Sequence, residues 1–412
     1  MLTEMGKRAK AAAQVLRTAG SAQKDAALTA IADAFIKNSQ NIITANDKDI
    51  AFGKDNGLSE SLLDRLRLTE SRIADISAAM LDIVKLPDPV GEVLEGSVRP
   101  NGLRIEKVRV PMGVIGIIYE ARPNVTADAA ALCLKTGNAC ILRGGKEAIN
   151  SNKILADIMR TAIADSGLPA DAVQLIEDTS RESSNALMKL NGYVDVLIPR
   201  GGAGLINAVV RNATVPVIET GVGNCHAYVD ESADIDMAAN IVYNAKTSRV
   251  SVCNALETLL VHSKIADKAL PAIAARLNEK NVELRGCEKT ALILDNVIPA
   301  AEDDYYTEFN DYILAVRVVD SLGEAIDHIA KYSSGHSETI ITNDFSSAEI
   351  FTGAVDSAAV YVNASTRFTD GGEFGLGAEI GISTQKLHAR GPMGLKEMTT
   401  VKYIIRGNGQ IR

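Results

Sequence analysis

The sequence predicts an α/β fold in which parallel sheets are covered by helices on both faces and are divided between two domains. From residue 114 onward, short apolar runs of strand length alternate with segments that carry helix start and stop signals. These apolar runs are continuous rather than alternating, which is typical of parallel strands buried on both faces. The length of 412 residues allows two domains with sizeable cores.

The composition is that of an ordinary globular protein. Hydrophobic residues make up 46% and charged residues 23% of the chain. The formal net charge of -9 argues against a nucleic-acid surface, because phosphate binding needs clustered Lys and Arg. No apolar run approaches the ~20 residues that cross a bilayer, and the first residues have no signal-peptide core. The five cysteines lack CxxC spacing, so we expect reduced thiols in the cytoplasm, and the five scattered histidines predict no metal site.

Residues 3–85 are predicted to be helical. Gly20 ends the first helix, and three hydroxyl side chains are placed to cap the helices that follow: Ser21, Ser59 and Thr69. Pro87 and Pro89 end the helical run, since proline lacks the N–H that a helix interior requires.

A β-hairpin is predicted at residues 93–110, where apolar residues flank the turn sequence Arg99-Pro-Asn-Gly102. A hairpin that leaves a helical layer has little core of its own and usually packs on another element, often a second subunit. A surface meander within the same domain is the alternative.

A strand–helix alternation follows the hairpin. Strands are predicted at residues 114–119, 139–142, 173–176, 194–198 and 215–218, and the helices between them begin at Thr126, at Asn150 or Ser151, at Ser183 and at Leu205. Ligands of such sheets bind outside the carboxyl ends of the strands. The chain places polar loops there, at residues 119–124, 143–147, 199–204 and 219–226. We therefore expect a ligand site at this edge.

The loop at residues 199–204 carries glycines directly before a predicted helix. Gly201 and Gly202 allow a phosphate to approach backbone N–H groups at the positive end of the helix dipole. The loop lacks GxGxxG spacing, so an ordinary turn is the alternative.

The second half of the chain repeats the alternation around one notable cysteine. Strands are predicted at residues 255–261, 312–319, 338–341, 358–362 and 399–405, with helices at 265–277, 322–332 and 345–354. Cys253 lies in a small polar turn between a helical and a strand-like segment, close in sequence to Lys246 and Arg249. These cations favour the thiolate, which is the nucleophilic form of cysteine. A buried structural thiol is the alternative.

Several motifs follow one another along the chain: Tyr119-Glu-Ala-Arg-Pro-Asn-Val-Thr126, Leu142-Arg-Gly-Gly-Lys-Glu-Ala148, Ile218-Glu-Thr-Gly-Val-Gly-Asn-Cys-His226, Ser251-Val-Cys-Asn-Ala-Leu-Glu-Thr258, Asn363-Ala-Ser-Thr-Arg-Phe-Thr-Asp370 and Arg390-Gly-Pro-Met-Gly-Leu395. Together they resemble the aldehyde dehydrogenase superfamily over nearly the whole chain, and within it the acyl-phosphate reductases of proline biosynthesis. The resemblance implies NADPH-dependent reduction of L-glutamate 5-phosphate to L-glutamate 5-semialdehyde, with release of phosphate, through a thioester on Cys253.

The same resemblance implies the architecture and the assembly. It implies a Rossmann-type cofactor domain (residues 1–91, 108–226 and 377–397), an α/β catalytic domain (227–376) and a β-hairpin oligomerisation arm (92–107 and 398–412). The expected assembly is a homo-oligomer, a dimer or a tetramer. The chemistry also suits an association with glutamate 5-kinase, which makes the unstable substrate.

The resemblance also assigns catalytic roles. The oxyanion donors are the side-chain amide of Asn124 and the backbone N–H of Cys253, although Asn124 also suits a helix entry. Glu219 occupies the place of the base that activates water in hydrolytic aldehyde dehydrogenases, and orienting a neighbour is its alternative role. His226 is a candidate proton donor or hydrogen-bond partner near the substrate, and a packing residue is the alternative.

Binding residues are implied in the same way. Lys146 matches the lysine that contacts the adenosine ribose, and Arg143 beside it suits the 2′-phosphate of NADP, whereas Glu147 is an argument for NAD. Gly201 and Gly202 fall near the pyrophosphate. Glu308 is implied as a further cofactor contact, although Asn310-Asp311 stands where the family has Gly-Pro. The residues implied for the anionic substrate are Arg122, Arg249 and Arg367.

Two other functions compete with this reductase. A hydrolytic aldehyde dehydrogenase, which makes a carboxylic acid, is favoured by Glu219 and disfavoured by the Asn-Cys-His and Arg-rich motifs. A non-catalytic nucleotide-binding protein is disfavoured because Cys253, Asn124 and Lys146 occur together.

Overall fold

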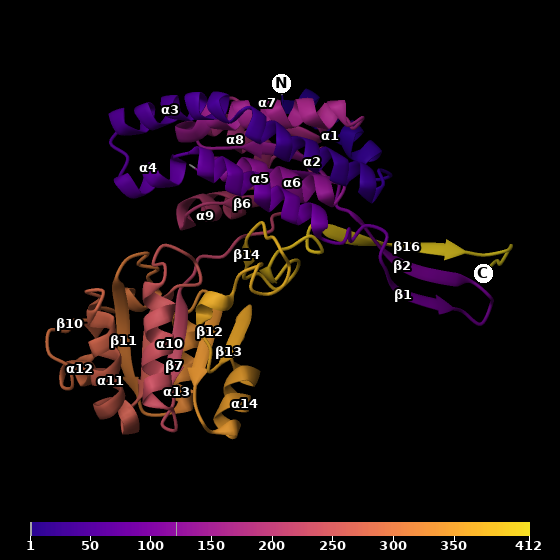
Figure 1. Ribbon diagram of the computed structural model, residues 1–412. Coiled ribbons are helices and arrows are strands. Elements are labelled where there is room, and N and C mark those ends of the chain that lie inside the picture. The colour runs from indigo at the N-terminus through magenta and orange to yellow at the C-terminus, as the bar shows by residue number, and fades with distance from the viewer. Residues whose placement is uncertain (1, 121) are drawn as a thin grey trace. The chain divides into compact units, whose positions relative to one another are not determined.

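The computed structural model describes residues 2–120 and 122–412, which divide into two compact units (Figure 1). The first unit runs to Thr220 and also includes Gly375–Gly381 and Met393–Arg412. The second unit comprises Gly221–Phe374 and Ile382–Pro392. The division therefore falls six residues before the expected boundary at 226/227, and residues 382–392 belong to the second unit rather than to the first.

The first unit opens with a layer of helices: α1 (Leu2–Leu16), α2 (Ser21–Lys37), α3 (Ser39–Asp55), α4 (Glu60–Leu66) and α5 (Glu70–Lys85). This confirms the helical prediction for residues 3–85, within which α3 was not foreseen. The hydroxyls of Ser59 and Thr69 cap α4 and α5 as predicted. The cap at Ser21 is wrong, because Gly20 is the N-cap and Ser21 is already helical.

A parallel sheet lies against these helices, with strand order β5-β4-β3-β6. Its strands are β3 (Val114–Tyr119), β4 (Ala139–Arg143), β5 (Val173–Leu175) and β6 (Val196–Arg200). The connecting elements are α6 (Pro123–Lys135), η1 (Lys146–Ala148), α7 (Ile149–Asp165), η2 (Ala170–Ala172), α8 (Arg181–Met188) and α9 (Ala203–Asn212). The predicted alternation of parallel strands and helices is thereby confirmed.

The strand predicted at residues 215–218 is wrong. The segment makes one isolated bridge, Leu197 to Val217, with hydrogen bonds from Leu197 N–H to Pro216 and from Ile218 N–H to Leu197. Pro216 has no N–H, so the ladder cannot extend from this bridge towards Val215.

The predicted helix start at Thr126 is also wrong, because α6 begins at Pro123. The Thr126 side chain is buried, where its hydroxyl donates to Asn152 Oδ1 at 2.8 Å and lies 2.6 Å from the Tyr119 hydroxyl. Thr126 therefore fastens α6 to β3 and α7.

The start of α7 is capped by a residue that is distant in the sequence. The carboxylate of Asp49, on α3, accepts hydrogen bonds from the backbone N–H groups of Asn150 and Ser151 at 3.1 and 2.8 Å. The predicted caps Asn150 and Ser151 are instead the first-turn residues that are being capped.

The predicted hairpin and closing strand form a separate antiparallel sheet of β1 (Val93–Val98), β2 (Arg104–Pro111) and β16 (Thr399–Arg406), in the order β1-β2-β16. Large apolar side chains of the outer strands are exposed, namely Val93, Leu94, Val98, Val401, Tyr403 and Ile405. We call this sheet the arm.

The second unit is built on a parallel sheet with strand order β10-β9-β11-β8-β7-β12-β13. Its strands are β7 (Cys225–Val229), β8 (Leu256–His262), β9 (Glu283–Gly286), β10 (Ile298–Pro299), β11 (Ile313–Val319), β12 (Ser337–Ile341) and β13 (Ala359–Val362). Its helices are α10 (Ile235–Thr247), α11 (Ser263–Asn278), α12 (Glu288–Ala291), η3 (Glu302–Tyr306), α13 (Leu322–Tyr332), α14 (Phe345–Ala354) and η4 (Thr366–Phe368), and β14 (Ile382–Ser383) pairs with β15 (Gly391–Pro392). The predicted strands and helices of this half are present, whereas β7, β9 and β10 were not predicted.

Helices cover both faces of this second sheet (Figure 1). Val242 and Leu259 belong to the buried cluster under α10 and α11, and Leu260, Ile329 and Phe351 to the cluster under α13 and α14. Leu259 and Leu260 are consecutive on β8 and point to opposite faces. Burial on both faces thus explains the continuous apolar pattern. Within the described residues, none of the helices is long and apolar enough to cross a membrane.

Candidate active site

Cys253 lies in a tight turn between α10 and β8. The backbone N–H of Ala255 donates to the carbonyl oxygen of Val252 at 3.0 Å, which makes Cys253 and Asn254 the central residues of a β-turn. Cys253 is half-buried, and the remaining cysteines are buried (Cys133, Cys140, Cys225) or half-buried (Cys287). The turn therefore gives a partly accessible thiol a defined backbone.

A second turn, which contains η4, is hydrogen-bonded to the turn of Cys253. The side-chain amide of Asn254 donates to the carbonyl oxygens of Thr369 and Arg367 at 2.9 and 3.3 Å. The Thr366 hydroxyl donates in return to the carbonyl oxygen of Asn254 at 2.7 Å. Asn254 was not singled out from the sequence, and the only signal for it was its place beside the cysteine.

Two of the predicted substrate arginines come together beside Cys253. Burial, and next the positive charge of Arg249, lower the pKa of Arg367, while Asp370 and the Cys253 thiol counteract this effect. The Nε–H of Arg367 donates to the Ser248 hydroxyl at 2.9 Å. Two guanidinium groups that repel each other beside a thiol form a setting suited to an anion.

A buried ion pair joins the two elements that flank this turn. Lys246 Nζ lies 2.6 Å from Glu257 Oε2, and both side chains are 0% exposed. Burial lowers the pKa of Lys246 and raises that of Glu257 to about 7, and the partner charge opposes both shifts. Lys246 therefore ties α10 to β8, which is a structural role and not the one that we predicted for it beside the thiol.

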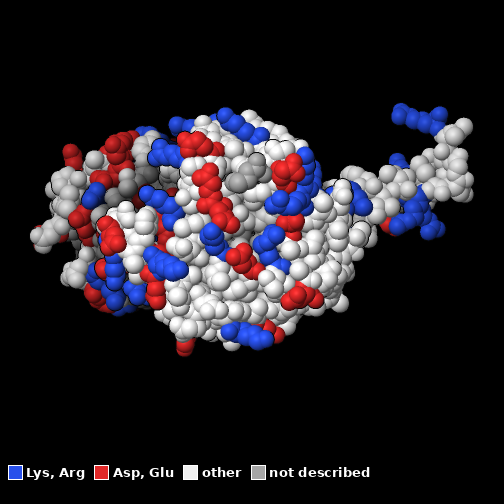
Figure 2. All heavy atoms as spheres, turned by 90° about the horizontal axis from the view of Figure 1, so that it is seen from above, with Lys and Arg blue, Asp and Glu red and all other residues white. Residues whose placement is uncertain are grey.

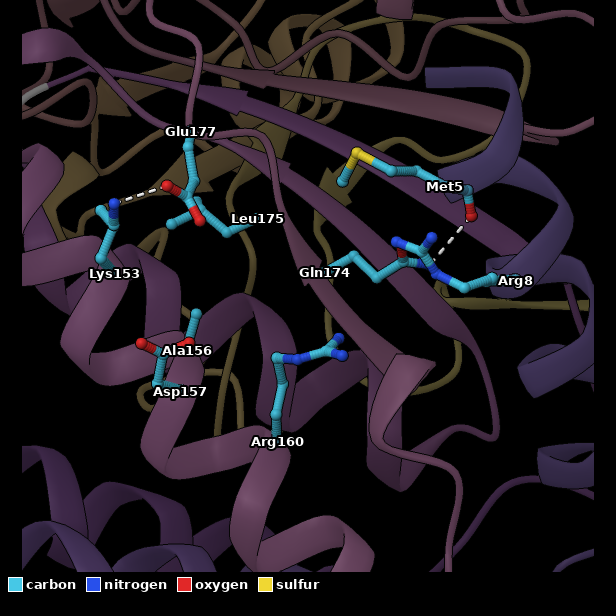
Figure 3. A pocket seen from close by; sticks show the side chains of 9 residues that line it. All are labelled: Met5, Arg8, Lys153, Ala156, Asp157, Arg160, Gln174, Leu175 and Glu177. Atoms are coloured by element: carbon cyan, nitrogen blue, oxygen red, sulfur yellow. Dashed lines mark hydrogen bonds and ion pairs between the residues drawn. The ribbon is translucent and has the colours of Figure 1, made fainter. Parts of the chain in front are cut away.

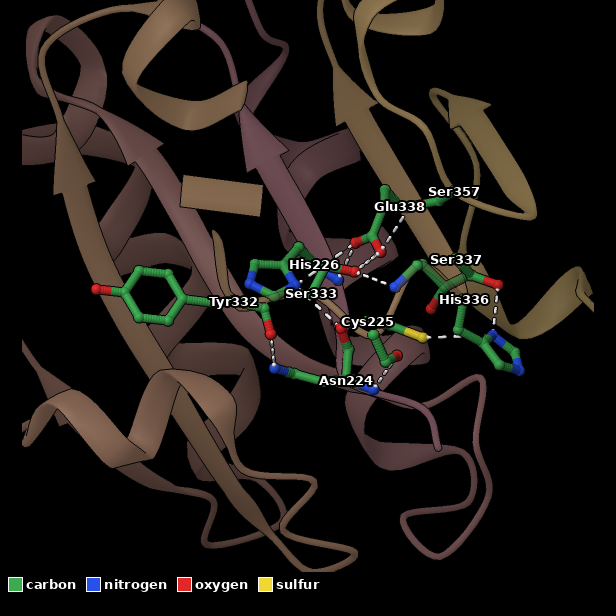
Figure 4. Close-up of polar contacts among 12 residues, drawn as sticks. Asn224, Cys225, His226, Tyr332, Ser333, His336, Ser337, Glu338 and Ser357 are labelled. Atoms are coloured by element: carbon green, nitrogen blue, oxygen red, sulfur yellow. Dashed lines mark hydrogen bonds and ion pairs between the residues drawn. The ribbon is translucent and has the colours of Figure 1, made fainter. Parts of the chain in front are cut away.

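Strand β7 begins in a buried polar network (Figure 4). Glu338 accepts hydrogen bonds from the backbone N–H of His226 at 2.6 Å and from the hydroxyls of Ser333 and Ser357. Burial raises the pKa of Glu338 to about 8 and lowers the pKa of His226 to about 4. His226 is thus a neutral, fully buried side chain, a setting typical of a packing residue.

Glu308 lies on the loop after η3 and holds the loop before β7. Its Oε1 accepts a hydrogen bond from the backbone N–H of Gly223 at 2.9 Å. Asn310 has a φ of 55°, in the left-handed region that glycine adopts freely and asparagine tolerates. The backbone of Asn310 therefore has the conformation that a glycine in this place would supply.

In the first unit, Asn124 is exposed in the first turn of α6. Its amide nitrogen donates to Asp128 Oδ2 at 3.1 Å, and burial raises the pKa of Asp128 to about 6. The amide has a second N–H for another acceptor. Sequence reasoning missed Asp128, although its spacing of four residues from Asn124 on a helix was a signal for this contact.

The glycine loop already holds an anionic group. Gly202 is the N-cap of α9, and its N–H donates to Glu120 Oε2 at 3.0 Å. A Cβ on Gly201 would lie 2.6 Å from the Glu120 carboxyl carbon. The Gly202 N–H at this helix N-terminus therefore donates to a carboxylate, and such a donor at the positive end of a helix dipole is suited to an anion. Glu120 was not predicted to take part.

Of the predicted ribose and phosphate contacts, Lys146 is exposed on η1 and Glu147 is half-buried. The Arg143 guanidinium donates to the carbonyl oxygens of Thr179 and Ser180 at 2.5 and 2.8 Å, and its pKa is lowered by burial. Lys146 is therefore the more accessible of the two predicted cations.

The remaining candidates, Arg122 and Glu219, also belong to the first unit. Arg122 is exposed as the N-cap of α6, and Glu219 is half-buried two residues after the bridge at Val217. Arg249 and Arg367 therefore share a unit with Cys253, whereas Arg122 and Glu219 do not. The described stretches hold no cluster of three or more His, Cys, Asp or Glu arranged for a metal ion.

A separate cavity of ≈ 210 Å³ in the first unit lies between α1, α7 and β5 (Figure 3). Its cations are paired: Lys153 lies 2.5 Å from Glu177, Arg160 lies 3.0 Å from Asp171, and Arg8 donates to Gln174. On the face that Figure 2 draws, Lys and Arg are likewise interspersed with Asp and Glu. Neither surface is typical of a polyanion site.

The chain matches the model of the aldehyde dehydrogenase family over residues 2–292. It is 62% identical over 408 residues to gamma-glutamyl phosphate reductase of Carboxydothermus hydrogenoformans, which covers 99% of this chain and 98% of that protein. Its fold matches the crystal structure of gamma-glutamyl phosphate reductase from Thermotoga maritima with a TM-score of 0.98 at 51% identity, over 99% of each chain.

More distant structures share the fold. An acetylating aldehyde dehydrogenase from Geobacillus thermoglucosidasius is 18% identical, with a TM-score of 0.69 over 99% of this chain and 97% of that one. At this identity the likeness concerns the fold alone, and it agrees with the aldehyde dehydrogenase-like architecture expected from the sequence.

Proposed function

The chain belongs to the aldehyde dehydrogenase family and, within it, to the gamma-glutamyl phosphate reductases, and we propose how its residues divide the reaction. The reaction is the reduction of L-glutamate 5-phosphate to L-glutamate 5-semialdehyde in proline biosynthesis. The single observation that carries the division of roles is the half-buried thiol of Cys253 beside Arg249 and Arg367.

Cys253 is the nucleophile. Its thiolate attacks the acyl carbon, the carbonyl π electrons move onto oxygen, and the collapse of this oxyanion expels phosphate and leaves a thioester. The Cys253 N–H and the Asn124 amide are the donors for the oxyanion, and Asp128 orients that amide. The neighbouring arginines favour the thiolate, because positive charge lowers the pKa of a thiol.

The anionic groups of the substrate are bound by arginines. Arg249 and Arg367 lie close enough for their charges to repel, and a hydrogen bond from the Asn254 amide to the Arg367 carbonyl oxygen holds the backbone of Arg367. Arg122 is the third candidate, at the N-terminus of α6. Guanidinium groups bind phosphate and carboxylate in a bidentate manner.

NADPH is the proposed form of the cofactor, and when bound it supplies the hydride that reduces the acyl group. Gly201 and Gly202 would hold the pyrophosphate at the α9 N-terminus, a place that suits an anion because the Glu120 carboxylate accepts a hydrogen bond there. Lys146 and Arg143 lie on the loop after β4 and suit a 2′-phosphate. Glu308 is the candidate contact in the second unit.

The first unit is then the cofactor-binding part and the second unit the catalytic part. The arm forms the contact with a second copy of the chain, because its exposed apolar side chains need a cover (Val93, Leu94, Val98, Val401, Tyr403 and Ile405). A cytoplasmic location suits the free cysteines. Association with glutamate 5-kinase would shorten the path of an unstable acyl phosphate.

The reaction run in reverse tests this proposal. Purified protein is mixed with glutamate semialdehyde and NADP, with and without inorganic phosphate, and NADPH absorbance is followed. Turnover that needs phosphate supports a thioester resolved by phosphate. Turnover of equal rate without phosphate would mean that water resolves the thioester, and Glu219 would then be the base. A Cys253→Ala variant that still turns over would exclude Cys253 as the nucleophile.

A further inference from the structure

A buried thiol is hydrogen-bonded to the carbonyl group of Cys253. Cys225, at the start of β7, donates its S–H to the carbonyl oxygen of Cys253 at 3.2 Å and is 0% exposed. Its sulfur also lies 3.8 Å from Nδ1 of His336, but the Ser337 hydroxyl already lies 2.8 Å from that nitrogen. The thiol has a single hydrogen, so the shorter contact directs it to the carbonyl. Burial raises the pKa of Cys225 well above its usual range, which keeps the donor protonated at neutral pH.

Gly223 lies against the same peptide. A Cβ added to Gly223 would lie 1.6 Å from the Cys253 carbonyl oxygen and 2.4 Å from its Cα, well inside van der Waals contact. The φ of Gly223 lies outside the left-handed region, so a side chain is allowed by the backbone itself. Glycine is therefore required at this position by the closeness of the cysteine peptide.

The loop that carries Gly223 and Cys225 is itself fixed by hydrogen bonds to neighbouring segments. The Gly223 N–H donates to Glu308, and the Asn224 N–H donates to the Ser334 hydroxyl, both at 2.9 Å. The side-chain amide of Asn224 donates to the carbonyl oxygens of Tyr305 and Tyr332 at 2.7 and 2.8 Å (Figure 4 shows the latter bond). These hydrogen bonds fix the position of the loop against which the Cys253 carbonyl group lies.

We propose that Gly223 and Cys225 are positioning residues for the acyl-transfer step, because they fix the central peptide of the turn that carries Cys253. The central peptide of a β-turn has two orientations, those of types I and II, which direct its carbonyl oppositely. Fixing one orientation fixes ψ of Cys253, and so the backbone conformation of the residue that carries the thiolate. The inference rests on the proposed function, in which Cys253 is the nucleophile.

Variants of the two residues test the inference in the phosphate-dependent reverse reaction. Gly223→Ala and Cys225→Ala are expected to lower kcat by roughly 10- to 100-fold, because a misplacement of about 1 Å at a reacting atom costs up to ~10²-fold. The KM for glutamate semialdehyde is expected to stay that of the parent protein. Cys225→Ser keeps a hydrogen-bond donor and is expected to recover most of the lost kcat.

A second readout is independent of turnover. Alkylation of Cys253 by iodoacetamide, followed by peptide mass spectrometry over a pH series, is expected to keep its midpoint in Gly223→Ala and Cys225→Ala. This small reagent needs no fixed approach direction, so a positioning role leaves its reaction unchanged. A midpoint shift that accounts for the lost kcat would contradict positioning and indicate an effect on the thiol pKa.

Matched controls separate positioning from general disturbance. In Gly286→Ala the added Cβ meets a Val297 side-chain atom at 2.6 Å, far along the sheet order from β7, and Cys140→Ala removes a fully buried thiol from the first unit. Kinetics equal to these controls, or a loss of turnover that matches the unfolded fraction by circular dichroism, would overturn the inference. Turnover in Cys253→Ala would instead overturn the proposed function, whatever the Gly223 variants do.

Discussion

The two units present their proposed functional residues in opposite ways. In the second unit, Cys253 stands in a turn whose flanking elements are joined by side chains with no exposed surface, Lys246 and Glu257. In the first unit, Asn124 and Lys146 are exposed at the starts of helical segments. The chemistry assigned to each unit explains the difference. A nucleophile acts only within a narrow geometry, whereas groups that contact a dissociating ligand must be reachable.

The contrast also appears in the number of bonds that hold each site. The turn of Cys253 is hydrogen-bonded through the backbone or side chains of both its central residues. The Gly202 N–H of the glycine loop instead donates to an exposed carboxylate, that of Glu120, which a ligand can replace. Substitutions of buried residues are therefore expected to have the larger effect in the second unit, and substitutions of exposed residues in the first unit.

The largest effect is expected from breaking the buried ion pair. Lys246→Met leaves Glu257 buried without its partner, and we expect a loss of about 3–5 kcal/mol in the free energy of unfolding of the second unit. Denaturant unfolding followed by circular dichroism measures this loss.

Its control is the double replacement of Lys246→Met with Glu257→Leu, which removes both charges. Because paired charges are often replaced by apolar groups at little cost, most of the stability is expected to return. A single variant as stable as the parent protein would show that the interior of the second unit does not depend on this pair.

The next effect concerns catalysis in the first unit. Asn124→Ala is expected to lower kcat by ~10²–10³, the usual loss when one oxyanion donor is removed. Steady-state kinetics of the reverse reaction measure it, with Asn41→Ala, an exposed helical asparagine, as the control. A kcat equal to that of the control would remove Asn124 from the oxyanion site.

A smaller effect is expected at the glycine loop. Glu120→Ala removes the carboxylate from the α9 N-terminus, and NADPH is then expected to bind about two- to fivefold more tightly, since a charge at a helix N-terminus is worth ~0.3–1 kcal/mol. Isothermal titration calorimetry measures the Kd, and Glu70→Ala, at the start of α5, is the control. Weaker binding in Glu120→Ala would mean that Glu120 contacts the cofactor and does not compete with it.

The smallest effect is a change in pH dependence. The pKa of Glu338 is raised from 4.5 to about 8 by burial, so the folded protein holds a proton that the unfolded chain releases. Its contribution to stability is therefore complete below about pH 4.5 and is lost as the pH rises towards 8. In Glu338→Gln, the fall in melting temperature across this range is expected to be shallower. An unchanged slope would show that Glu338 is ionised throughout.

Much of the fold could be predicted from local patterns. Helices α13 and α14 have the predicted bounds, and a capping side chain marks the start of each, Ser321 for α13 and Asp344 for α14. Strand β7 was missed because a histidine interrupts its apolar run, and the burial of His226 depends on Glu338 of β12. The cap of α7 was missed because it is Asp49, about a hundred residues earlier.

The candidate site divides in the same way. Cys253, Asn124 and Lys146 were proposed from motifs, since each stands in a recognisable local sequence. The residues that hold Cys253 in place could not be predicted from motifs. Cys225, for example, is 28 residues from Cys253 and is brought to it by the pairing of β7 with β8. Contacts between distant segments are set by packing, which local patterns do not record.

The most direct test of the account is a pre-steady-state burst measurement without phosphate. The protein is mixed in a stopped-flow instrument with glutamate semialdehyde and NADP, both in excess of the protein, and NADPH absorbance is followed before and after phosphate is added. The account predicts a burst limited to one NADPH per chain in the parent protein, renewed turnover on adding phosphate, a slower burst in Gly223→Ala and none in Cys253→Ala. A burst in Cys253→Ala, or continuous turnover before phosphate is added, would contradict it.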